Sequence, residues 1–190
     1  MLALTITAYA IGIVLLGCGS AILISMQIAR RSAAPFFPSA KTTVRLALRE
    51  AGLRRGETFY DLGAGTGASI VIADKEFGAR AIGAEISILP YLLAKIRIFL
   101  AGSKATMRFK DLFTEDVHDA DVVFCFLAER VLGRIAEKLR KELRPGARII
   151  SYAFTLPGMV PERTIPVHGA WKLYLYRIPE MGGRTTGSGE

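Results

Sequence analysis

The chain has 190 residues, enough for one domain with a buried core and too few for two large ones. It carries 25 lysines and arginines against 17 acidic residues, a formal net charge of +8, and two cysteines. Two distant cysteines exclude a disulfide framework and a cysteine-based metal site, and the absence of an arginine-rich run or zinc-finger spacing argues against a nucleic-acid partner.

An uncharged apolar segment opens the chain. No charged residue occurs from Leu2 to Ala29, and a helix of this length can cross a bilayer. Arg30 and Arg31 follow the segment and no basic residue precedes it. The positive-inside rule therefore predicts a signal anchor over residues 2–29, with the rest of a single-pass cell-membrane protein in the cytoplasm. A cleaved signal peptide fits less well, because there is no basic start and the apolar run continues past Cys18.

Residues 30–38 are rich in proline and predict a linker. Ser39 is a suitable N-cap for a helix ending near Leu53. Further strands are predicted at Thr58–Leu62, Arg80–Glu85, Ala105–Phe109, Asp121–Leu127, Arg148–Phe154 and Trp171–Arg177, and further helices at Thr66–Phe77, Leu89–Leu100 and Ala128–Arg144. This alternation predicts an α/β domain over residues 39–178, with a mostly parallel sheet covered by helices on both faces. The glycine-rich end, residues 179–190, predicts a disordered tail.

The stretch YDLGAGTGAS, residues 60–69, is the clearest binding motif. It follows the first predicted strand of the domain, and ligands bind beyond the carboxyl ends of parallel strands. A P-loop is excluded because Gly63–Ser69 contains no lysine. A dinucleotide site remains possible: Gly63, Gly65 and Ala68 match its glycine pattern, and Glu85 ends the next strand, where it could hold ribose hydroxyls.

S-adenosylmethionine accounts for more of these residues. Asp61 precedes the turn and Gly67 completes three glycines on a two-residue spacing. A carboxylate at this place favours the sulfonium and ammonium groups of S-adenosylmethionine and would repel a pyrophosphate. Glu85 would accept hydrogen bonds from the ribose, and Asp111, just past the third strand, from the adenine amino group. Three acids at the ends of three successive strands therefore favour S-adenosylmethionine over a dinucleotide.

Several longer stretches resemble a known family, namely PFFPSAKTTVRLAL, FYDLGAGTGAS, AIGAEIS, MRFKDLF, DVVFCFL and KLRKELRPGARIISYAF. Across roughly residues 35–178 the chain resembles class I S-adenosylmethionine-dependent methyltransferases. Within them it is similar to the protein-lysine methyltransferases that include the archaeal broad-specificity enzyme and the mitochondrial enzymes for the ATP synthase c subunit and the adenine nucleotide translocase. The resemblance implies a Rossmann-like fold.

The resemblance also implies roles for single residues. Asp61, Gly63, Gly65 and Glu85 would bind the cofactor, with Asp111 near the adenine. The element Phe36-Phe37-Pro38-Ser39 would cover the methionine end of the cofactor and shape a lysine channel. Three positions depart from the family: an Asp and an Arg are missing around Gly67, Phe36 aligns with a usual tyrosine, and Tyr152 stands where relatives often carry histidine. Phe36, Phe37 and Tyr152 are therefore the candidate channel residues, and no general base is identified.

The first functional hypothesis is a lysine methyltransferase, anchored at the cytoplasmic membrane face, that acts on membrane-associated proteins. Its chemistry would be an in-line displacement by a neutral lysine amine, which positioning and an apolar channel would favour. A methyltransferase for a small-molecule or lipid substrate would use the same site. A membrane-tethered scaffold without turnover is the alternative outside enzymes.

Overall fold

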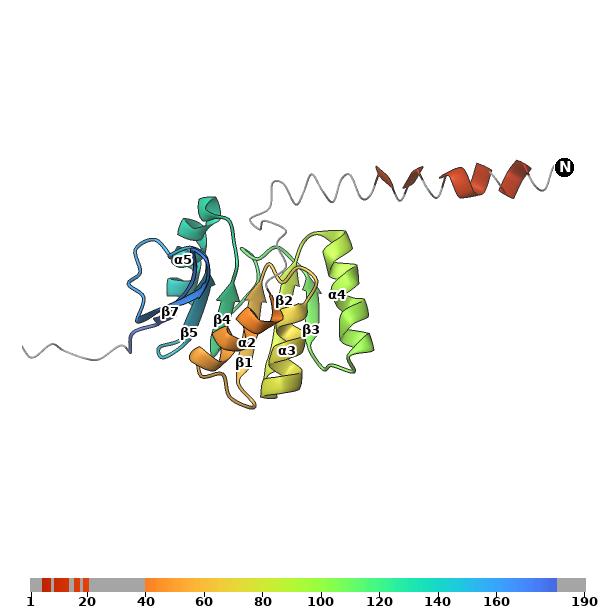
Figure 1. Cartoon of the computed structure of the whole chain (residues 1–190). Coiled ribbons are helices and arrows are strands. Elements are labelled where there is room, and N and C mark those ends of the chain that lie inside the picture. Colours follow the sequence, from red (N-terminus) through yellow and green to blue (C-terminus); the bar gives the residue numbers. More distant parts are fainter. Residues whose placement is uncertain (1–4, 8, 14–15, 18, 21–39, 181–190) are drawn as a thin grey trace, which may run out of the picture.

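Figure 1 shows a computed structural model of the chain, in which a twisted sheet has helices on both faces. The structure describes residues 5–7, 9–13, 16–17, 19–20 and 40–180. One sheet contains the seven strands of the described residues, in the order β3-β2-β1-β4-β5-β7-β6. The strands are β1 (Thr58–Leu62), β2 (Arg80–Glu85), β3 (Thr106–Phe109), β4 (Val122–Cys125), β5 (Arg148–Tyr152), β6 (Arg163–His168) and β7 (Trp171–Arg177).

Strands β1 to β5 are mutually parallel, whereas β7 pairs antiparallel with both β5 and β6. The chain order reverses beside β1, which lies between β2 and β4. In open sheets of this kind, such a switch point leaves a crevice beyond the carboxyl ends of the strands, where ligands bind. The glycine turn follows β1 and therefore lies at this crevice.

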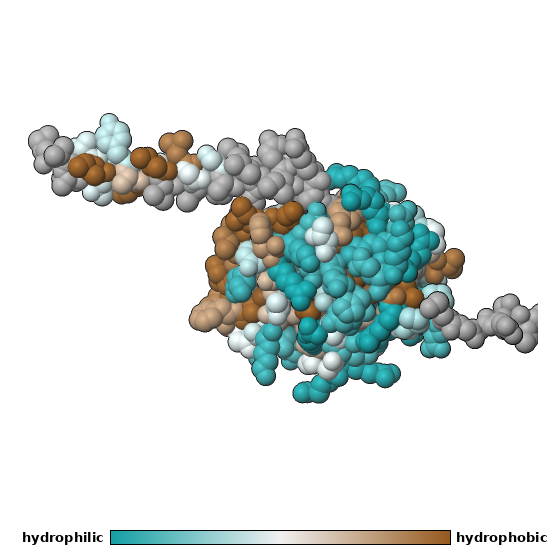
Figure 2. Space-filling view, turned by 180° about the vertical axis from the view of Figure 1, so that it is seen from behind, coloured by the Kyte–Doolittle hydropathy of each residue, from teal (hydrophilic) through white to brown (hydrophobic). Residues whose placement is uncertain are grey.

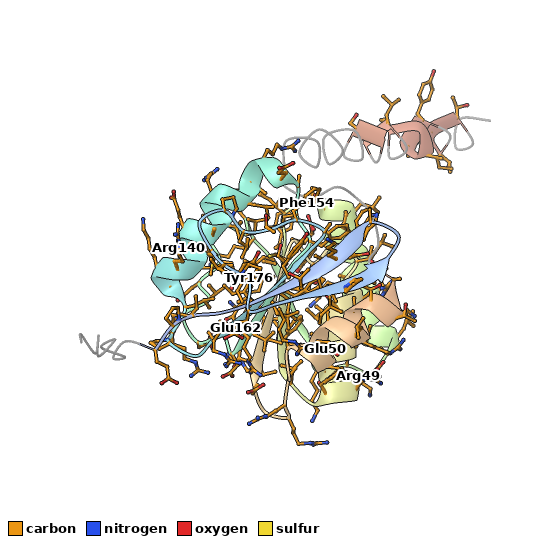
Figure 3. The ribbon with its side chains drawn as sticks, turned by 60° about the vertical axis from the view of Figure 1, so that its left-hand side comes forward. Arg49, Glu50, Arg140, Phe154, Glu162 and Tyr176 are labelled. Carbon is orange, nitrogen blue, oxygen red and sulfur yellow. The ribbon has the colours of Figure 1, made fainter. Side chains whose placement is uncertain are left out.

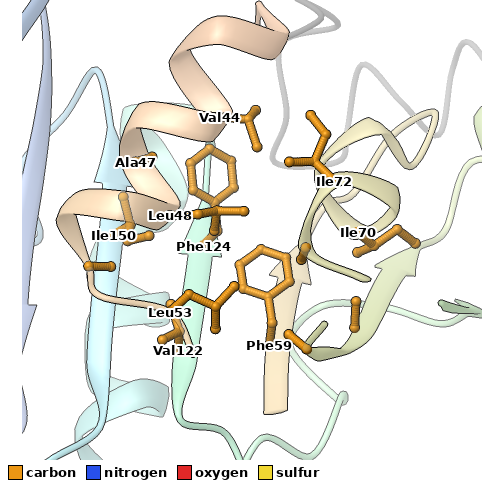
Figure 4. Close-up of a cluster of buried hydrophobic side chains, with 14 of the residues drawn as sticks. Val44, Ala47, Leu48, Leu53, Phe59, Ile70, Ile72, Val122, Phe124 and Ile150 are labelled. Atoms are coloured by element: carbon orange, nitrogen blue, oxygen red, sulfur yellow. The ribbon is translucent and has the colours of Figure 1, made fainter. Parts of the chain in front are cut away.

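Within residues 40–180, three helices cover one face of the sheet and one covers the other. Helices α2 (Lys41–Glu50), α3 (Ala68–Phe77) and α4 (Ile88–Leu100) contribute to one buried cluster, and α5 (Glu129–Glu142) contributes to the second. Figure 4 shows the first cluster, in which Val44 and Leu48 of α2 lie over Phe59, Phe124 and Ile150 of the sheet. This burial of aromatic and branched side chains on both faces is what the predicted α/β class requires.

The predicted α/β organisation is confirmed, and the bounds of β1, β2 and β7 agree with those expected. Strands β3, β4 and β5 and helices α2, α3 and α5 are each shorter than predicted by one or more residues. Strand β6 was not predicted. It contains Pro166 and an irregularity between Pro166 and His168, features that an edge strand tolerates because one side of its backbone is unpaired.

Part of the predicted N-terminal anchor can be compared with the structure. Residues 5–7, 9–13, 16–17 and 19–20 are helical and largely exposed. Among the described residues, no helix combines the length and hydropathy needed to cross a membrane. The other residues of the anchor, the linker with its candidate residues Phe36 and Phe37, Ser39, and residues 181–190 of the predicted tail lie outside the described residues. The anchor therefore stays a prediction.

Candidate active site

The three glycines of the turn have different surroundings. Gly63, Gly65 and Gly67 all have positive φ angles, of 82°, 52° and 72°, which glycine adopts without strain. A Cβ on Gly65 would have no heavy atom within 4 Å, so this side of the turn is open to a ligand. A Cβ on Gly67 would instead lie 2.9 Å from the Cβ of Ala94. Gly65 thus leaves room for a ligand, whereas Gly67 lets α3 begin against α4.

Glu85, at the end of β2, faces the glycine turn. Its side chain is 8% exposed, its Oε2 accepts a hydrogen bond from the Gly65 N–H at 3.1 Å, and its Oε1 accepts one from the Ser87 N–H at 2.7 Å. Each carboxylate oxygen has a further lone pair. The two backbone donors fix the carboxylate in place, and its remaining capacity fits two neighbouring ribose hydroxyls.

Asp61, at the end of β1, is 4% exposed and accepts a hydrogen bond from the Ser69 hydroxyl. Burial raises the pKa of Asp61 from 3.8 to about 7, the Ser69 hydrogen bond opposes this rise, and the nearby charge of Glu85 adds to it. Among the described residues, no basic side chain forms an ion pair with Asp61 or Glu85. Two close, buried carboxylates without a counter-ion favour a cationic ligand and disfavour a pyrophosphate. These residues fit S-adenosylmethionine.

Asp111 lies two residues beyond β3 and holds a turn. Its Oδ1 accepts a hydrogen bond from the Phe113 N–H at 2.9 Å, and its carbonyl oxygen accepts from the N–H groups of Thr114 and Glu115, both at 3.0 Å. The side chain is partly exposed. This contact is the turn-capping role that aspartate often has. The contact of Asp111 with adenine stays a prediction.

Three aromatic side chains form an aromatic wall at the same edge of the sheet. The wall consists of Phe126, just after β4, Tyr152, at the end of β5, and Trp171, at the start of β7. The ring centroids of Phe126 and Tyr152 are 4.6 Å apart, those of Phe126 and Trp171 5.6 Å, and those of Tyr152 and Trp171 5.4 Å. Tyr152 was a predicted channel residue. Phe126 and Trp171 were missed, although both lie where a predicted strand meets this edge.

The acids and the aromatic wall lie on the same face of the sheet. Side chains alternate between faces along a strand, so Asp61 shares the face of Phe59, and Phe126 shares that of Phe124. Phe59, Phe124, Phe126 and Tyr152 all belong to the cluster under α2, α3 and α4. Since β1 pairs with β4 and β4 with β5, the wall begins one strand away from Asp61.

The backbone after Tyr152 is held in an unusual conformation. Ala153 has a φ angle of +76°, the one positive value at a residue other than glycine in the described part of the chain. Its N–H donates to the carbonyl of Lys172 at 2.9 Å, and the Ser151 hydroxyl donates to the carbonyl of Phe154 at 2.6 Å. Figure 3 shows Phe154 at one end of the domain and Glu50 toward the other. Such strain persists where surrounding contacts impose it, and here those contacts fix the turn beside the aromatic wall.

The sequence of the chain matches a methyltransferase family and is similar to individual lysine N-methyltransferases. The family described as the ANTKMT methyltransferase domain matches residues 61–163. A protein-lysine N-methyltransferase of Saccharolobus islandicus (strain REY15A) is 34% identical over 152 residues, 77% of this chain and 94% of that protein. The adenine nucleotide translocase lysine N-methyltransferase of Mus musculus is 34% identical over 134 residues, 68% of this chain and 57% of the mouse protein.

A solved structure is similar over most of the chain. The crystal structure of an RNA methyltransferase from Salinibacter ruber, in complex with S-adenosyl-L-homocysteine, superposes with a TM-score of 0.73 at 30% identity. The similarity covers 78% of this chain and 97% of that one. S-adenosyl-L-homocysteine is what remains of S-adenosylmethionine after its methyl group has been transferred, so this neighbour binds the product form of the ligand that fits Asp61 and Glu85.

Proposed function

Because the chain belongs to the ANTKMT methyltransferase family and is similar to two lysine N-methyltransferases, we propose that it methylates lysine side chains of proteins at a membrane surface. The family membership confirms the resemblance drawn from the sequence, and the chain is an S-adenosylmethionine-dependent methyltransferase. The lysine acceptor rests on one observation: the wall of Phe126, Tyr152 and Trp171 begins one strand from Asp61, with which no described basic side chain forms an ion pair.

S-adenosylmethionine supplies a methyl group already activated by attachment to a positively charged sulfur. The protein's task is to hold this cofactor and the acceptor in line and to keep water away. Glu85 fits the ribose, and Gly65, whose N–H donates to Glu85, leaves open space where a Cβ would stand. Asp61, ionised when a cation lies beside it, stabilises the positively charged methionine end.

The aromatic wall is an apolar surface along which the side chain of a substrate lysine could lie. A free lysine has a pKa of about 10.4 and must lose its proton before its amine can attack. Phe126 and Tyr152 are buried, whereas Trp171 is 39% exposed, so the wall runs from solvent into the domain. An apolar surface of this kind disfavours the charged ammonium and lowers the pKa of the amine. Helix α2 ends beside the start of β5, where Arg148 donates hydrogen bonds to the carbonyls of Ala51 and Gly52. The helix therefore begins toward the opposite edge, the site edge, near which the resemblance places Phe36 and Phe37.

The membrane location is proposed from the sequence and supported by charge. Residues 2–29 lack charge, and Arg30 and Arg31 follow them, which favours an anchor with the domain at the cytoplasmic face. The net charge of +8 would attract the domain to anionic lipid. An anchored enzyme meets membrane-associated substrates at a raised local concentration without any added contact.

The test is to supply the full chain with S-adenosylmethionine labelled in its methyl group, together with membranes from its own cell. Protein, RNA and lipid are then separated, and labelled protein is hydrolysed to identify the amino acid. We expect methyllysine, and less label with Glu85→Ala at the same cofactor concentration. Label in RNA would instead indicate an RNA methyltransferase, as the Salinibacter ruber neighbour is named. Label in lipid would favour the small-molecule or lipid alternative. Failure to bind the cofactor would favour a scaffold.

A further inference from the structure

Helix α4 exposes an apolar face that no other described part of the chain covers. Only Pro90 and Ala94 of its 13 residues are buried. Seven large apolar side chains, between 40% and 83% exposed, form what we call the α4 face: Ile88, Leu89, Leu92, Leu93, Ile96, Phe99 and Leu100. Figure 2 shows apolar surface along the side of the domain that carries this helix, beside a largely hydrophilic surface. A contiguous set of large exposed apolar side chains on a folded domain marks a contact with a partner or a membrane.

The α4 face is broad and is bordered by cations. At about 100° per residue, its seven side chains fall within an arc of roughly 140°. Lys95 projects about 20° outside one border of this arc and Arg97 about 40° outside the other. Long basic side chains at the borders of an apolar arc can extend to phosphate groups while their aliphatic stems stay in an apolar layer.

The surrounding sequence has no accessible negative charge. Between Glu85 and Asp111 there are five basic residues, Lys95, Arg97, Lys104, Arg108 and Lys110, and no acidic residue. Arg108 and Lys110 pair with Glu115. Within the described part of the chain, Lys95, Arg97 and Lys104 form no ion pair. The α4 face is thus apolar at its centre and cationic at its rim.

We propose that the α4 face lies in the headgroup region of an anionic bilayer, with the helix parallel to the membrane plane. Helices that bind in this way combine an apolar face with lysine and arginine beside it, and they bind anionic lipid more strongly than neutral lipid. Docking through α4 is a second membrane contact, separate from the anchor predicted at residues 2–29. It does not depend on the lysine acceptor proposed above.

Other occupants fit the charge and shape less well. In a two-fold dimer through α4, the face would meet itself, and Lys95 and Arg97 would approach the same cations of the second copy. A single partner helix would cover a narrow seam, whereas the apolar arc here spans roughly 140°. An anionic lipid surface covers a broad arc and pairs with cations on both of its borders at once.

This orientation would bring the site to the membrane surface. Helix α4 begins three residues after Glu85, and Oε1 of Glu85 accepts the hydrogen bond from the N–H of Ser87, the residue before the helix. The cofactor site therefore lies at the N-terminal end of a helix about 20 Å long. If α4 lies flat in the headgroups, the site opens beside the bilayer. Acceptors would then be side chains close to the lipid surface.

The test measures how deeply α4 enters lipid in the full chain. A nitroxide is attached at Phe99→Cys, in a Cys18→Ser background, because Cys125 is fully buried and stays unlabelled. The matched control carries the label at Glu137→Cys, an exposed position on α5, across the sheet. Both proteins are placed in nanodiscs of phosphatidylcholine, with or without phosphatidylglycerol. Accessibility of the nitroxide to oxygen, which concentrates in lipid, is compared with accessibility to a water-soluble nickel complex.

We expect the oxygen-to-nickel accessibility ratio at position 99 to exceed that at position 137 severalfold in discs with phosphatidylglycerol. Lys95→Glu should lower the ratio at position 99, while Lys141→Glu on α5 should leave it unchanged. Cofactor affinity, measured in the same samples, should be equal in all variants and reports that the domain is folded. Equal ratios at positions 99 and 137 would overturn the proposal. Magnetic coupling between labels on two copies would overturn it in favour of a dimer. Neither readout requires an acceptor, so this test and that of lysine methylation fail independently.

Discussion

Replacing Asp61 with asparagine should stabilise the free chain above neutral pH and, at the same pH, weaken cofactor binding. Asp61 is almost fully buried, no basic side chain in the described part of the chain forms an ion pair with it, and its pKa is raised from 3.8 to about 7. Asparagine has nearly the same shape and can still accept the hydrogen bond from the Ser69 hydroxyl through its amide oxygen. The substitution therefore removes the charge and keeps the packing.

The sign of the pH dependence of stability follows from the number of protons that the folded and unfolded chains bind. Between about pH 4 and pH 7 the folded chain holds a proton on Asp61 that the unfolded chain has lost, so the free energy of unfolding falls as pH rises through this window. A pKa difference of one unit corresponds to about 1.4 kcal/mol. The raised pKa of Asp61 therefore lowers the free energy of unfolding above pH 7 by at most roughly 4 kcal/mol. We expect Asp61→Asn to gain about 1–4 kcal/mol at pH 8, roughly a third of that gain at pH 5, and almost nothing below about pH 4.

The affinity for the cofactor should change in the opposite direction: the substitution that stabilises the free chain at pH 8 should weaken cofactor binding at that pH. At pH 8 the variant lacks the carboxylate that pairs with the methionine end, and a hydrogen bond to a charged group contributes about 1.5–3 kcal/mol. At pH 5.5 the wild-type carboxyl is itself protonated, so the two proteins should bind with similar affinity. A cofactor fragment without the amino-acid portion, methylthioadenosine, should bind both proteins equally at either pH.

The assays are urea unfolding and calorimetric titration between pH 5 and pH 8. Asp74→Asn is the matched control. Asp74 Oδ2 accepts hydrogen bonds from the Ser103 hydroxyl at 2.6 Å and the Lys104 N–H at 2.8 Å, at a distance from the turn. This control should lower stability and leave cofactor affinity unchanged. If Asp61→Asn also lowers stability at pH 8, the buried carboxylate is already compensated within the fold and the reasoning is wrong.

Three further substitutions separate the parts of the site. Glu85→Ala should weaken cofactor binding by about 1.5–3 kcal/mol in calorimetric titration, because the ribose loses a charged acceptor. Gly67→Ala should lower the free energy of unfolding in urea by about 2–4 kcal/mol, because its φ is +72° and its Cβ would lie 2.9 Å from that of Ala94. Gly65→Ala, at a φ of +52° but with no neighbour, should lower it by only the backbone strain of about 1–2 kcal/mol and should also weaken cofactor binding. Trp171→Ala should raise the KM for a protein acceptor about tenfold, the equivalent of one aromatic contact, and an altered cofactor Kd would refute a role confined to the acceptor.

Much of the site was predictable because parallel strands end at one edge. Once strands were assigned at 58–62 and 80–85, their last residues had to lie side by side, and the structure places Asp61 and Glu85 at that edge on the same face. The glycine turn lies beside the two acids because of the order of the strands in the sheet and the alternation of side chains between its two faces. Both follow from hydrophobic patterning along the chain.

The rest depends on contacts between segments that are distant in sequence. Trp171 reaches the site because β7 runs antiparallel and begins where β5 ends, and no local pattern specifies that pairing. The role of Gly67 depends on the approach of Ala94, 27 positions later. Strand β6 was missed because Pro166 argues against a strand unless the segment is known to lie at an edge.

The exposed side of α4 is best explained by a partner outside the fold. Its buried residues, Pro90 and Ala94, have small side chains, and Ala94 serves the glycine turn by packing against Gly67. The inner side of the helix thus supports the cofactor site, while the large side chains of the α4 face stay 40% or more exposed. Polar residues on that face would cost no core packing and would avoid exposing apolar surface to water. Folding alone therefore does not account for an apolar face with cations on both borders, whereas an anionic membrane surface accounts for the apolar side chains and the cations together.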